Sequence, residues 1–196
     1  MIIVSRFTPQ PAYEAAARRL LESCRRFDLP CLIERVKQDP GSWNDAVNAK
    51  PDWILNTLLN RREAILWLDA DCEIVQMPTA IIGTSADVAC YNFAADSDGV
   101  HGIAYDPNKL VCATGVLWVA YTAGAIELLL RWMSAIKQHP DIRGSDPCLD
   151  LAYNTCRPPV HTLWLPKSYN RMDSLWPGVD PVIDHHYCEG KLRDAS

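Results

Sequence analysis

The sequence lacks any apolar run long enough to cross a bilayer. Its most apolar stretch, GVLWVAY, is far shorter than the roughly 20 residues that a spanning helix needs. The first residues, MIIVSRFTP, have no charged segment followed by a long apolar one and do not resemble a signal peptide. Basic residues are also in the minority: 19 lysines and arginines face 24 aspartates and glutamates, and the formal net charge is -5. We therefore expect a cytoplasmic protein with no membrane span and no nucleic-acid partner.

No C-x-x-C pair is present. The eight cysteines are spread singly along the chain. This pattern favours small buried hydrophobic side chains in a reducing compartment over a zinc site or a disulfide framework.

Stretches typical of strands alternate with stretches typical of helices. Strand patterns are predicted at 2–7, 31–36, 64–69, 87–93, 112–120, 160–166 and 182–187, and helical patterns at 13–27, 50–60, 122–138 and 145–154. Residues 39–45, DPGSWND, are rich in turn formers and are predicted to be a loop. With 196 residues and no linker or repeat, the sequence predicts one α/β domain over 1–196, with an open sheet flanked by helices.

The segment ILWLDADCEIV is the most informative. An apolar strand ends in Asp69 and Asp71, which flank Ala70. In an extended chain these two carboxylates point to the same side, where they repel each other unless a cation lies between them. Ligands of open α/β sheets bind at the carboxyl ends of strands, so the pair indicates a Mg²⁺ or Mn²⁺ site. A helix cap or a polar turn is the alternative interpretation.

The longer segment ILWLDADCEIVQMP resembles the D-x-D region of GT-A-fold glycosyltransferases. Other segments resemble this group in the same order: TPQPAYEAAARRLLESC, NAKPDWILNTL, ATGVLWVAYTAGAIELLLRW, GSDPCLDLAYN and LWLPKSYN. The resemblance implies a Rossmann-like open mixed sheet. It also implies transfer of a sugar from a nucleotide-sugar, most commonly a UDP-sugar, to an acceptor hydroxyl, with Mn²⁺ or Mg²⁺ as cofactor.

The same resemblance implies roles for individual residues. Asp71 would hold the metal, and Asp69 would hold the metal and contact the ribose. The other expected donor-site residues are Thr8, Pro9, Tyr13 and Lys50.

The tail VIDHHYCEGK resembles the terminal metal-binding segment of glycogenin-like retaining enzymes. His186 would complete the metal site and Lys191 would meet the diphosphate, with His185 as an alternative ligand. Two exposed histidines near a chain end are the structural alternative.

Two further residues are candidates for catalysis. Asp146 follows the group's pattern only in part, because Pro147 stands where glutamine is common. It would be a base in an inverting enzyme or would position the donor in a retaining one, and its alternative role is a helix cap.

Asn170 is a candidate sugar contact. Among the tryptophans, Trp43, Trp164 and Trp176 can stack on sugar rings or lie in the core.

Two other functions fit parts of the sequence. A haloacid-dehalogenase-like Mg²⁺ phosphatase also has a strand followed by D-x-D, with Asp69 as nucleophile, but Glu73 stands where that family has Thr or Val. A catalytically silent module that only binds a nucleotide-sugar is the other alternative. The sequence leaves the sugar, the acceptor, the stereochemical outcome and the oligomeric state open.

Overall fold

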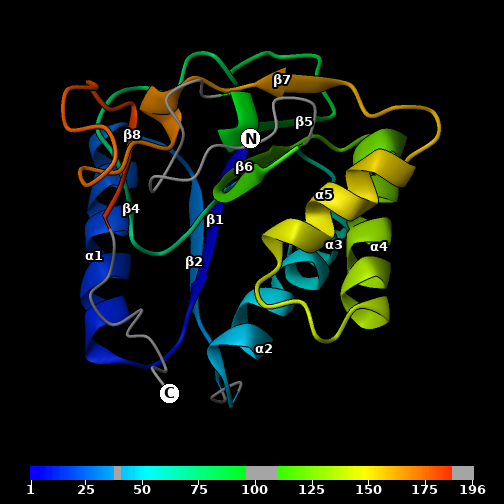
Figure 1. The fold of residues 1–196 in the computed structure, drawn as a ribbon. Helices are drawn as coiled ribbons and strands as arrows, with labels where there is room; N and C mark the ends of the chain where they lie inside the picture. Colours follow the sequence, from blue (N-terminus) through cyan, green and yellow to red (C-terminus); the bar gives the residue numbers. More distant parts are fainter. Residues whose placement is uncertain (38–40, 96–109, 187–196) are drawn as a thin grey trace.

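The computed structural model describes residues 1–37, 41–95 and 110–186, and their helices and strands alternate along the chain (Figure 1). The strands are β1 (Ile2–Phe7), β2 (Cys31–Arg35), β3 (Ile65–Leu68), β4 (Cys72–Ile74), β5 (Val88–Asn92), β6 (Cys112–Val119), β7 (Thr162–Trp164) and β8 (Ile183–His185). The helices are α1 (Pro11–Arg26), α2 (Trp43–Asn48), α3 (Lys50–Arg61), α4 (Ala123–Gln138) and α5 (Asp146–Thr155), with 3₁₀ turns η1 (Phe93–Ala95) and η2 (Lys167–Tyr169).

A mixed six-stranded sheet forms the centre of the molecule. Its strand order is β2-β1-β3-β6-β5-β7. Strands β1, β2 and β3 are parallel, β6 is antiparallel to both β3 and β5, and β7 is parallel to β5. The predicted open mixed α/β sheet is therefore confirmed. Strands β4 and β8 form a separate antiparallel pair.

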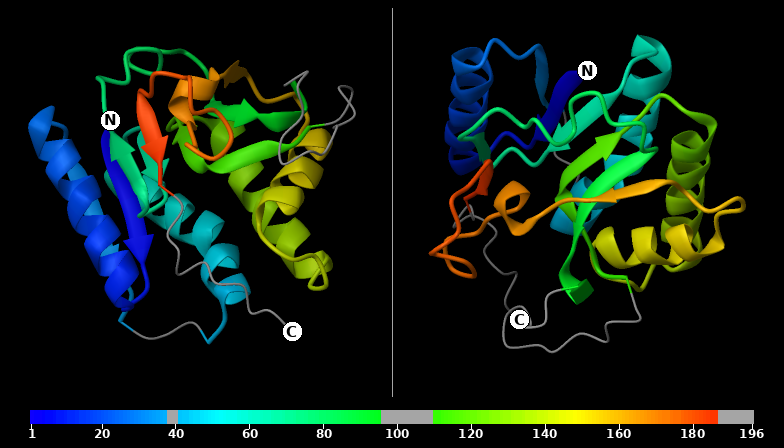
Figure 2. Two further views of the ribbon diagram at one scale, coloured as in Figure 1. Left: turned by 60° about the vertical axis from the view of Figure 1, so that its left-hand side comes forward. Right: turned by 90° about the horizontal axis from the view of Figure 1, so that it is seen from above.

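Helices cover both faces of the sheet, as Figure 2 shows, with α1 on one side and α3, α4 and α5 on the other. Neighbouring residues of β1 illustrate why two cores form. Val4 packs into the cluster that includes α3, α4 and α5, whereas Ile3 packs into the cluster that includes α1. Because side chains alternate along a strand, an almost continuously apolar sequence can fill both cores.

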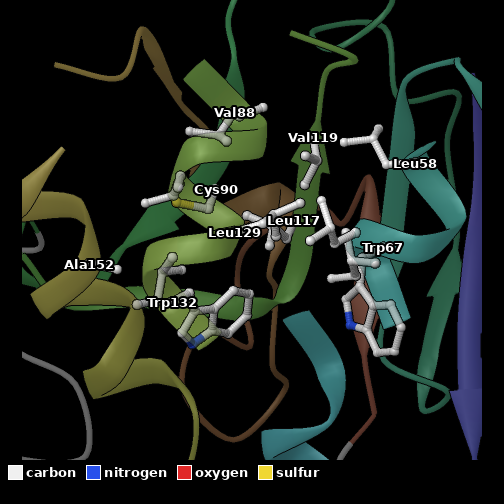
Figure 3. Packing of buried hydrophobic residues seen from close by; sticks show 14 of the residues in the cluster. Leu58, Trp67, Val88, Cys90, Leu117, Val119, Leu129, Trp132 and Ala152 are labelled. Carbon is white, nitrogen blue, oxygen red and sulfur yellow. The ribbon is translucent and has the colours of Figure 1, made fainter. Parts of the chain in front are cut away.

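The larger core centres on Trp132 of α4, which is fully buried (Figure 3). Trp67 of β3, Leu117 of β6 and Ala152 of α5 belong to the same cluster. The indole N–H of Trp132 donates to the carbonyl oxygen of Ser145, 2.8 Å away, so the side chain also fixes the residue before α5.

Residues 39–45 are not entirely loop, contrary to the prediction. Helix α2 begins at Trp43 because Ser42 caps it, and the Ser42 hydroxyl accepts the backbone N–H of Asp45 at 3.1 Å. Serine is common in turns, but its side-chain oxygen equally suits the start of a helix. Residues 38–40 lie outside the described part of the chain.

Six of the seven cysteines that the structure describes are buried, and Cys31 is partly exposed. Among the described residues, no helix has the length and apolar character needed to span a membrane.

Truncating Trp132 tests the larger core. We expect Trp132→Ala to lower the free energy of unfolding by about 3–5 kcal/mol, because it leaves a cavity and removes the hydrogen bond to Ser145. Leu130→Ala on the same helix is the control, since Leu130 is 47% exposed, and it should cost less than about 1 kcal/mol. Urea denaturation of both variants measures the difference, and equal losses would contradict the packing described here.

Candidate active site

Asp69 lies at the carboxyl end of β3, where described residues on α3 and β3 donate to its carboxylate. Its Oδ1 accepts hydrogen bonds from the Lys50 ammonium at 2.9 Å and from the Trp67 indole N–H at 2.8 Å. Trp67 precedes it by two residues, so the two side chains share one side of the strand. The backbone N–H of Asp69 donates to the Gly115 carbonyl oxygen, 2.8 Å away, which continues the pairing of β3 with β6.

Lys50 is the buried cation of this site. Only 6% of its surface is exposed, and its Nζ also donates to the carbonyl and hydroxyl oxygens of Thr114, at 3.2 and 3.1 Å. The ammonium lies 5.3 Å from the centre of the Trp67 ring. A buried ammonium needs several acceptors to offset the loss of water, and these contacts supply them.

Asp146, the first residue of α5, contacts Thr114 from the other side. Its carboxylate accepts the Thr114 hydroxyl and, at 3.4 Å, the Thr114 backbone N–H. One turn later, Asp150 accepts the backbone N–H of Cys112 at 2.9 Å. Two carboxylates four residues apart on a helix thus match two N–H groups two residues apart on β6, and they dock α5 on the strand. Ser145, not Asp146, occupies the N-cap position.

Asp71 pairs with a histidine from the far end of the chain. The chain turns at residues 70–71, where the Cys72 N–H donates to the Asp69 carbonyl oxygen, so the extended geometry assumed from the sequence does not hold there. Strand β4 then pairs with β8 and sets Cys72 opposite His185. As a result, His185 Nε2 lies 3.1 Å from Asp71 Oδ1, and both side chains are almost fully buried.

Gly115 leaves the space that the His185 ring occupies. A Cβ atom at position 115 would lie 2.5 Å from His185 Cε1 and 3.5 Å from Asp69 Oδ2. The same glycine is therefore next to both the imidazole and the first carboxylate, which places the Asp71–His185 pair beside the Asp69–Lys50 pair.

The donors of this site suit a divalent metal. Asp71, Cys72 and His185 have ligand atoms within 4.8 Å of one another. His185 Nδ1 is buried and has no hydrogen-bond partner in the described part of the chain. Carboxylate and imidazole ligands suit Mn²⁺, and carboxylates suit Mg²⁺. The Cys72 thiol lies 3.6 Å from the Gly115 carbonyl oxygen within the second core, so it is the least suitable of the three ligands.

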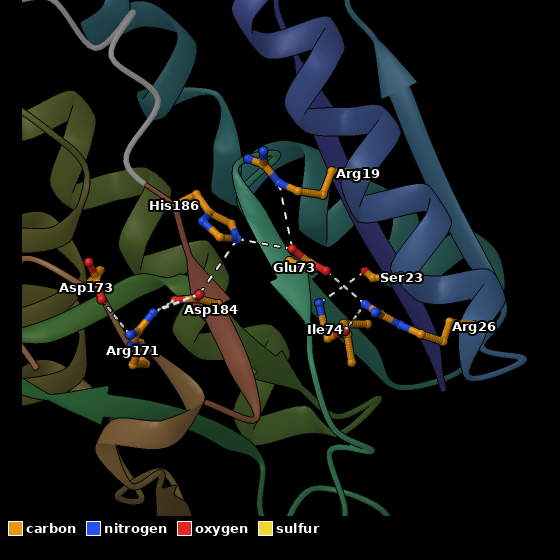
Figure 4. A network of polar contacts seen from close by, with 9 residues as sticks. All are labelled: Arg19, Ser23, Arg26, Glu73, Ile74, Arg171, Asp173, Asp184 and His186. Atoms are coloured by element: carbon orange, nitrogen blue, oxygen red, sulfur yellow. Dashed lines mark hydrogen bonds and ion pairs between the residues drawn. The ribbon is translucent and has the colours of Figure 1, made fainter. Parts of the chain in front are cut away.

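His186 faces a different set of groups from His185 (Figure 4). Its Nε2 lies 3.2 Å from Glu73 and 3.7 Å from Asp184. Glu73 also accepts a hydrogen bond from Arg26 of α1 at 2.9 Å. Burial acts to raise the pKa of Glu73, but the hydrogen bonds from Arg26 and His186 outweigh it and lower that pKa. His186 thus contacts Glu73, the residue that joins β4 to α1, and of the two histidines it is His185 that lies beside Asp71.

The remaining expected residues have different surroundings. Thr8 and Pro9 follow β1, which is parallel to β3, so they lie at the same edge of the sheet as Asp69. Tyr13 is in the first turn of α1. Asn170 is buried, and its amide has no hydrogen-bond partner among the described residues. Lys191 lies outside the described residues.

Sequence reasoning did not assign Thr114 and Gly115 to the D-x-D site. Thr114 links Lys50 to Asp146, and Gly115 makes room for His185. Their signal in the sequence is a small polar residue and a glycine inside the otherwise apolar run 112–119, a position where glycine often marks a close approach of other groups.

Comparison with solved structures identifies the architecture. A glycosyltransferase involved in glycosylation of the major capsid of PBCV-1 aligns with 94% of this chain and 91% of its own, at a TM-score of 0.70 and 16% identity. The chain has the fold of GT-A glycosyltransferases. The galactosyltransferase LgtC, solved with donor and acceptor sugar analogues, aligns with 95% of this chain and 87% of its own (TM-score 0.60, 13% identity).

Mouse xyloside xylosyltransferase 1 aligns with 96% of this chain and 98% of its own, at a TM-score of 0.53 and 12% identity. No protein-family model and no curated sequence matches the chain. Because the sequence identities are only 12–16%, these comparisons show that the fold is shared.

The buried carboxyl group of Asp150 makes the stability of the folded chain depend on pH. Burial raises its pKa to about 6, above the ordinary value of 3.8, although the hydrogen bond from Cys112 acts to lower it. The folded state therefore disfavours the carboxylate, and stability falls as the pH rises from about 4 to about 6. Asp150→Asn removes this penalty. Relative to the native chain, the variant should gain up to about 3 kcal/mol in unfolding free energy between pH 4 and pH 7.

Urea denaturation across this pH range measures the effect. Asp173→Asn is the control because the Asp173 side chain is 80% exposed, and its difference from the native chain should stay small across the range. Parallel pH profiles for Asp150→Asn and the native chain would contradict the assignment.

Proposed function

We propose that this chain is a metal-dependent glycosyltransferase that moves a sugar from a UDP-sugar to an acceptor hydroxyl. The observation that carries the proposal is the contact of Asp71 with His185, beside the Asp69–Lys50 ion pair, at the carboxyl end of β3. The shared fold with solved glycosyltransferases supports it. In this proposal residues 1–196 act as one domain.

Asp71 and His185, with Asp69, are the residues that would hold Mn²⁺ or Mg²⁺. When bound, such an ion neutralises the charge that grows on a leaving nucleoside diphosphate. The buried unpartnered Nδ1 of His185 and the hard oxygen donors of the aspartates support this ligand set.

The chain's own residues would perform the other tasks. Thr8, Pro9 and Tyr13, at the end of β1 and the start of α1, would contact the nucleotide. Lys50 holds Asp69 in place and adds a positive charge in a region largely withdrawn from water, where its field is strong.

Asp146 and Asn170 would serve the sugar-bearing side of the reaction. Asp146 already accepts two hydrogen bonds from Thr114, which in turn accepts from Lys50. In the proposal Asp146 holds Thr114, and through it Lys50, in position next to the donor sugar. Asn170 would offer its unpartnered buried amide to a sugar hydroxyl, because a buried amide without partners is costly unless a ligand satisfies it.

Calorimetric titration with UDP, GDP and a plain phosphomonoester, each with and without Mn²⁺, tests the function. We expect UDP to bind only with Mn²⁺, and Asp71→Asn to weaken this binding at least tenfold because a metal ligand loses its charge. Asp173→Asn, on an exposed aspartate, is the matched control and should bind like the native chain. Slow hydrolysis of the phosphomonoester without nucleotide binding would instead indicate a phosphatase with Asp69 as nucleophile. Metal-dependent UDP binding without hydrolysis or transfer of any UDP-sugar would indicate a silent module.

Gly115→Ala tests whether the position of His185 matters for metal binding. The new methyl group would stand within 3 Å of the buried imidazole and would push it away from Asp71. We expect Mn²⁺ affinity, measured by electron paramagnetic resonance, to fall about tenfold or more while the variant stays folded. Gly178→Ala is the control, since a Cβ atom there meets nothing within 4 Å. Unchanged Mn²⁺ affinity in Gly115→Ala would exclude His185 as a ligand.

A further inference from the structure

A cavity of about 250 Å³ lies between α2 and the connection from α4 to α5. Figure 1 shows these two segments beside each other, and the Gly144 N–H donates to the Asn44 side-chain oxygen at 2.8 Å. The walls include Trp43 and Asn44 from α2, and Asp141 and Arg143 from the connection. This volume is below the roughly 300–1,000 Å³ of pockets for drug-sized molecules and suits a single sugar ring.

The aromatic wall of this cavity is open to solvent. Trp43 is 39% exposed, and the Arg143 guanidinium carbon lies 5.7 Å from its ring centre. Gly144 allows the chain to turn here, because its φ of +83° is strained for other residues.

The charges of the cavity balance. Asp141 and Arg143, which both line the cavity, carry opposite charges. The carboxylate can accept hydrogen bonds from a ligand and the guanidinium can donate them. An aromatic wall with one acceptor group and one donor group fits a neutral sugar, which has an apolar ring face and a rim of hydroxyls. A sugar acid would meet Asp141 as well as Arg143.

Both walls of the cavity lead directly to the candidate active site. The α2 wall continues through Ala49 into Lys50, and the other wall continues through Ser145 into Asp146. The Ser145 carbonyl is held by the buried Trp132, so this wall is fixed. Since three residues span at most about 11 Å, Arg143 lies close to Asp146.

Hydrogen bonds link Asp146 to Thr114, Thr114 to Lys50 and Lys50 to Asp69, and Gly115 lies next to both Asp69 and His185, which contacts Asp71. The connection that lines the cavity leads into Asp146, which in this series of contacts is the residue most steps away from the candidate metal ligands Asp71 and His185. We propose that the cavity beside Trp43 is the acceptor subsite and that it takes a neutral hexose residue. This assignment of an acceptor role rests on the proposed glycosyl transfer.

Saturation-transfer NMR with methyl glycosides of glucose, galactose and mannose, in the presence of a chelator, tests the subsite without the metal site. At least one of these neutral glycosides should bind the native chain. Trp43→Ala should lower its signal at least fivefold, and Asp141→Asn at least threefold. Tyr121→Ala is the matched control, because Tyr121 is 43% exposed but follows the end of β6, and it should leave the signal unchanged.

Three results would overturn the assignment: no neutral glycoside binds, the Trp43→Ala chain binds as well as the native one, or methyl glucuronide binds better than the neutral glycosides. Calorimetry with UDP and Mn²⁺ on chelator-free samples of the same proteins separates the two proposals. Glycoside binding that depends on Trp43, without any UDP binding, would keep the sugar subsite and refute the transferase. UDP binding without glycoside binding would do the reverse.

Discussion

The buried ammonium of Lys50 is the constraint around which the site is organised. At 6% exposure it has lost nearly all contact with water, so the fold must supply acceptors from several elements at once. Asp69 comes from the end of β3 and Thr114 from β6, while Lys50 itself begins α3. Removing Asp69 would leave the Lys50 ammonium buried without its counter-charge, which costs far more than the pair contributes to stability. The relative positions of α3, β3 and β6 are fixed together for this reason.

The second organising element is the small sheet in which the chain returns to Asp71. Strands β4 and β8 have three residues each, too few to be stable alone. They are held by contacts with α1, through Arg26 and Glu73, and by the ion pair of Arg171 with Asp184. Because β8 is extended, its neighbouring side chains alternate, and His185 faces inward to Asp71 while His186 faces Glu73. A shift of one residue in this pairing would exchange the two histidines.

Much of the fold could be predicted from the sequence, because hydrophobic periodicity is a local signal. Apart from α2 and the short strand β4, which were not predicted, the order of strands and helices followed from it, and so did the apolar strand that ends at Asp69. Three features could not be predicted in this way. The turn at residues 70–71 replaced an extended chain, Ser42 began a helix where a loop was expected, and the choice between His185 and His186 depended on the register of β8. Each is decided by contacts between residues far apart in the sequence or by a side chain with two possible local uses.

Strand β6 is twice as long as β3, and its first residues extend beyond the end of its shorter neighbour. There the polar groups that meet the active-site side chains are largely main-chain atoms: the Gly115 and Thr114 carbonyls and the N–H groups of Thr114 and Cys112. Main-chain atoms are present whatever the side chain. These main-chain groups, which form the floor of the site, are therefore kept by most substitutions in β6. Such a surface can keep its shape through extensive sequence drift. A chain can therefore share its architecture with solved structures at 12–16% identity while most of its side chains differ from theirs.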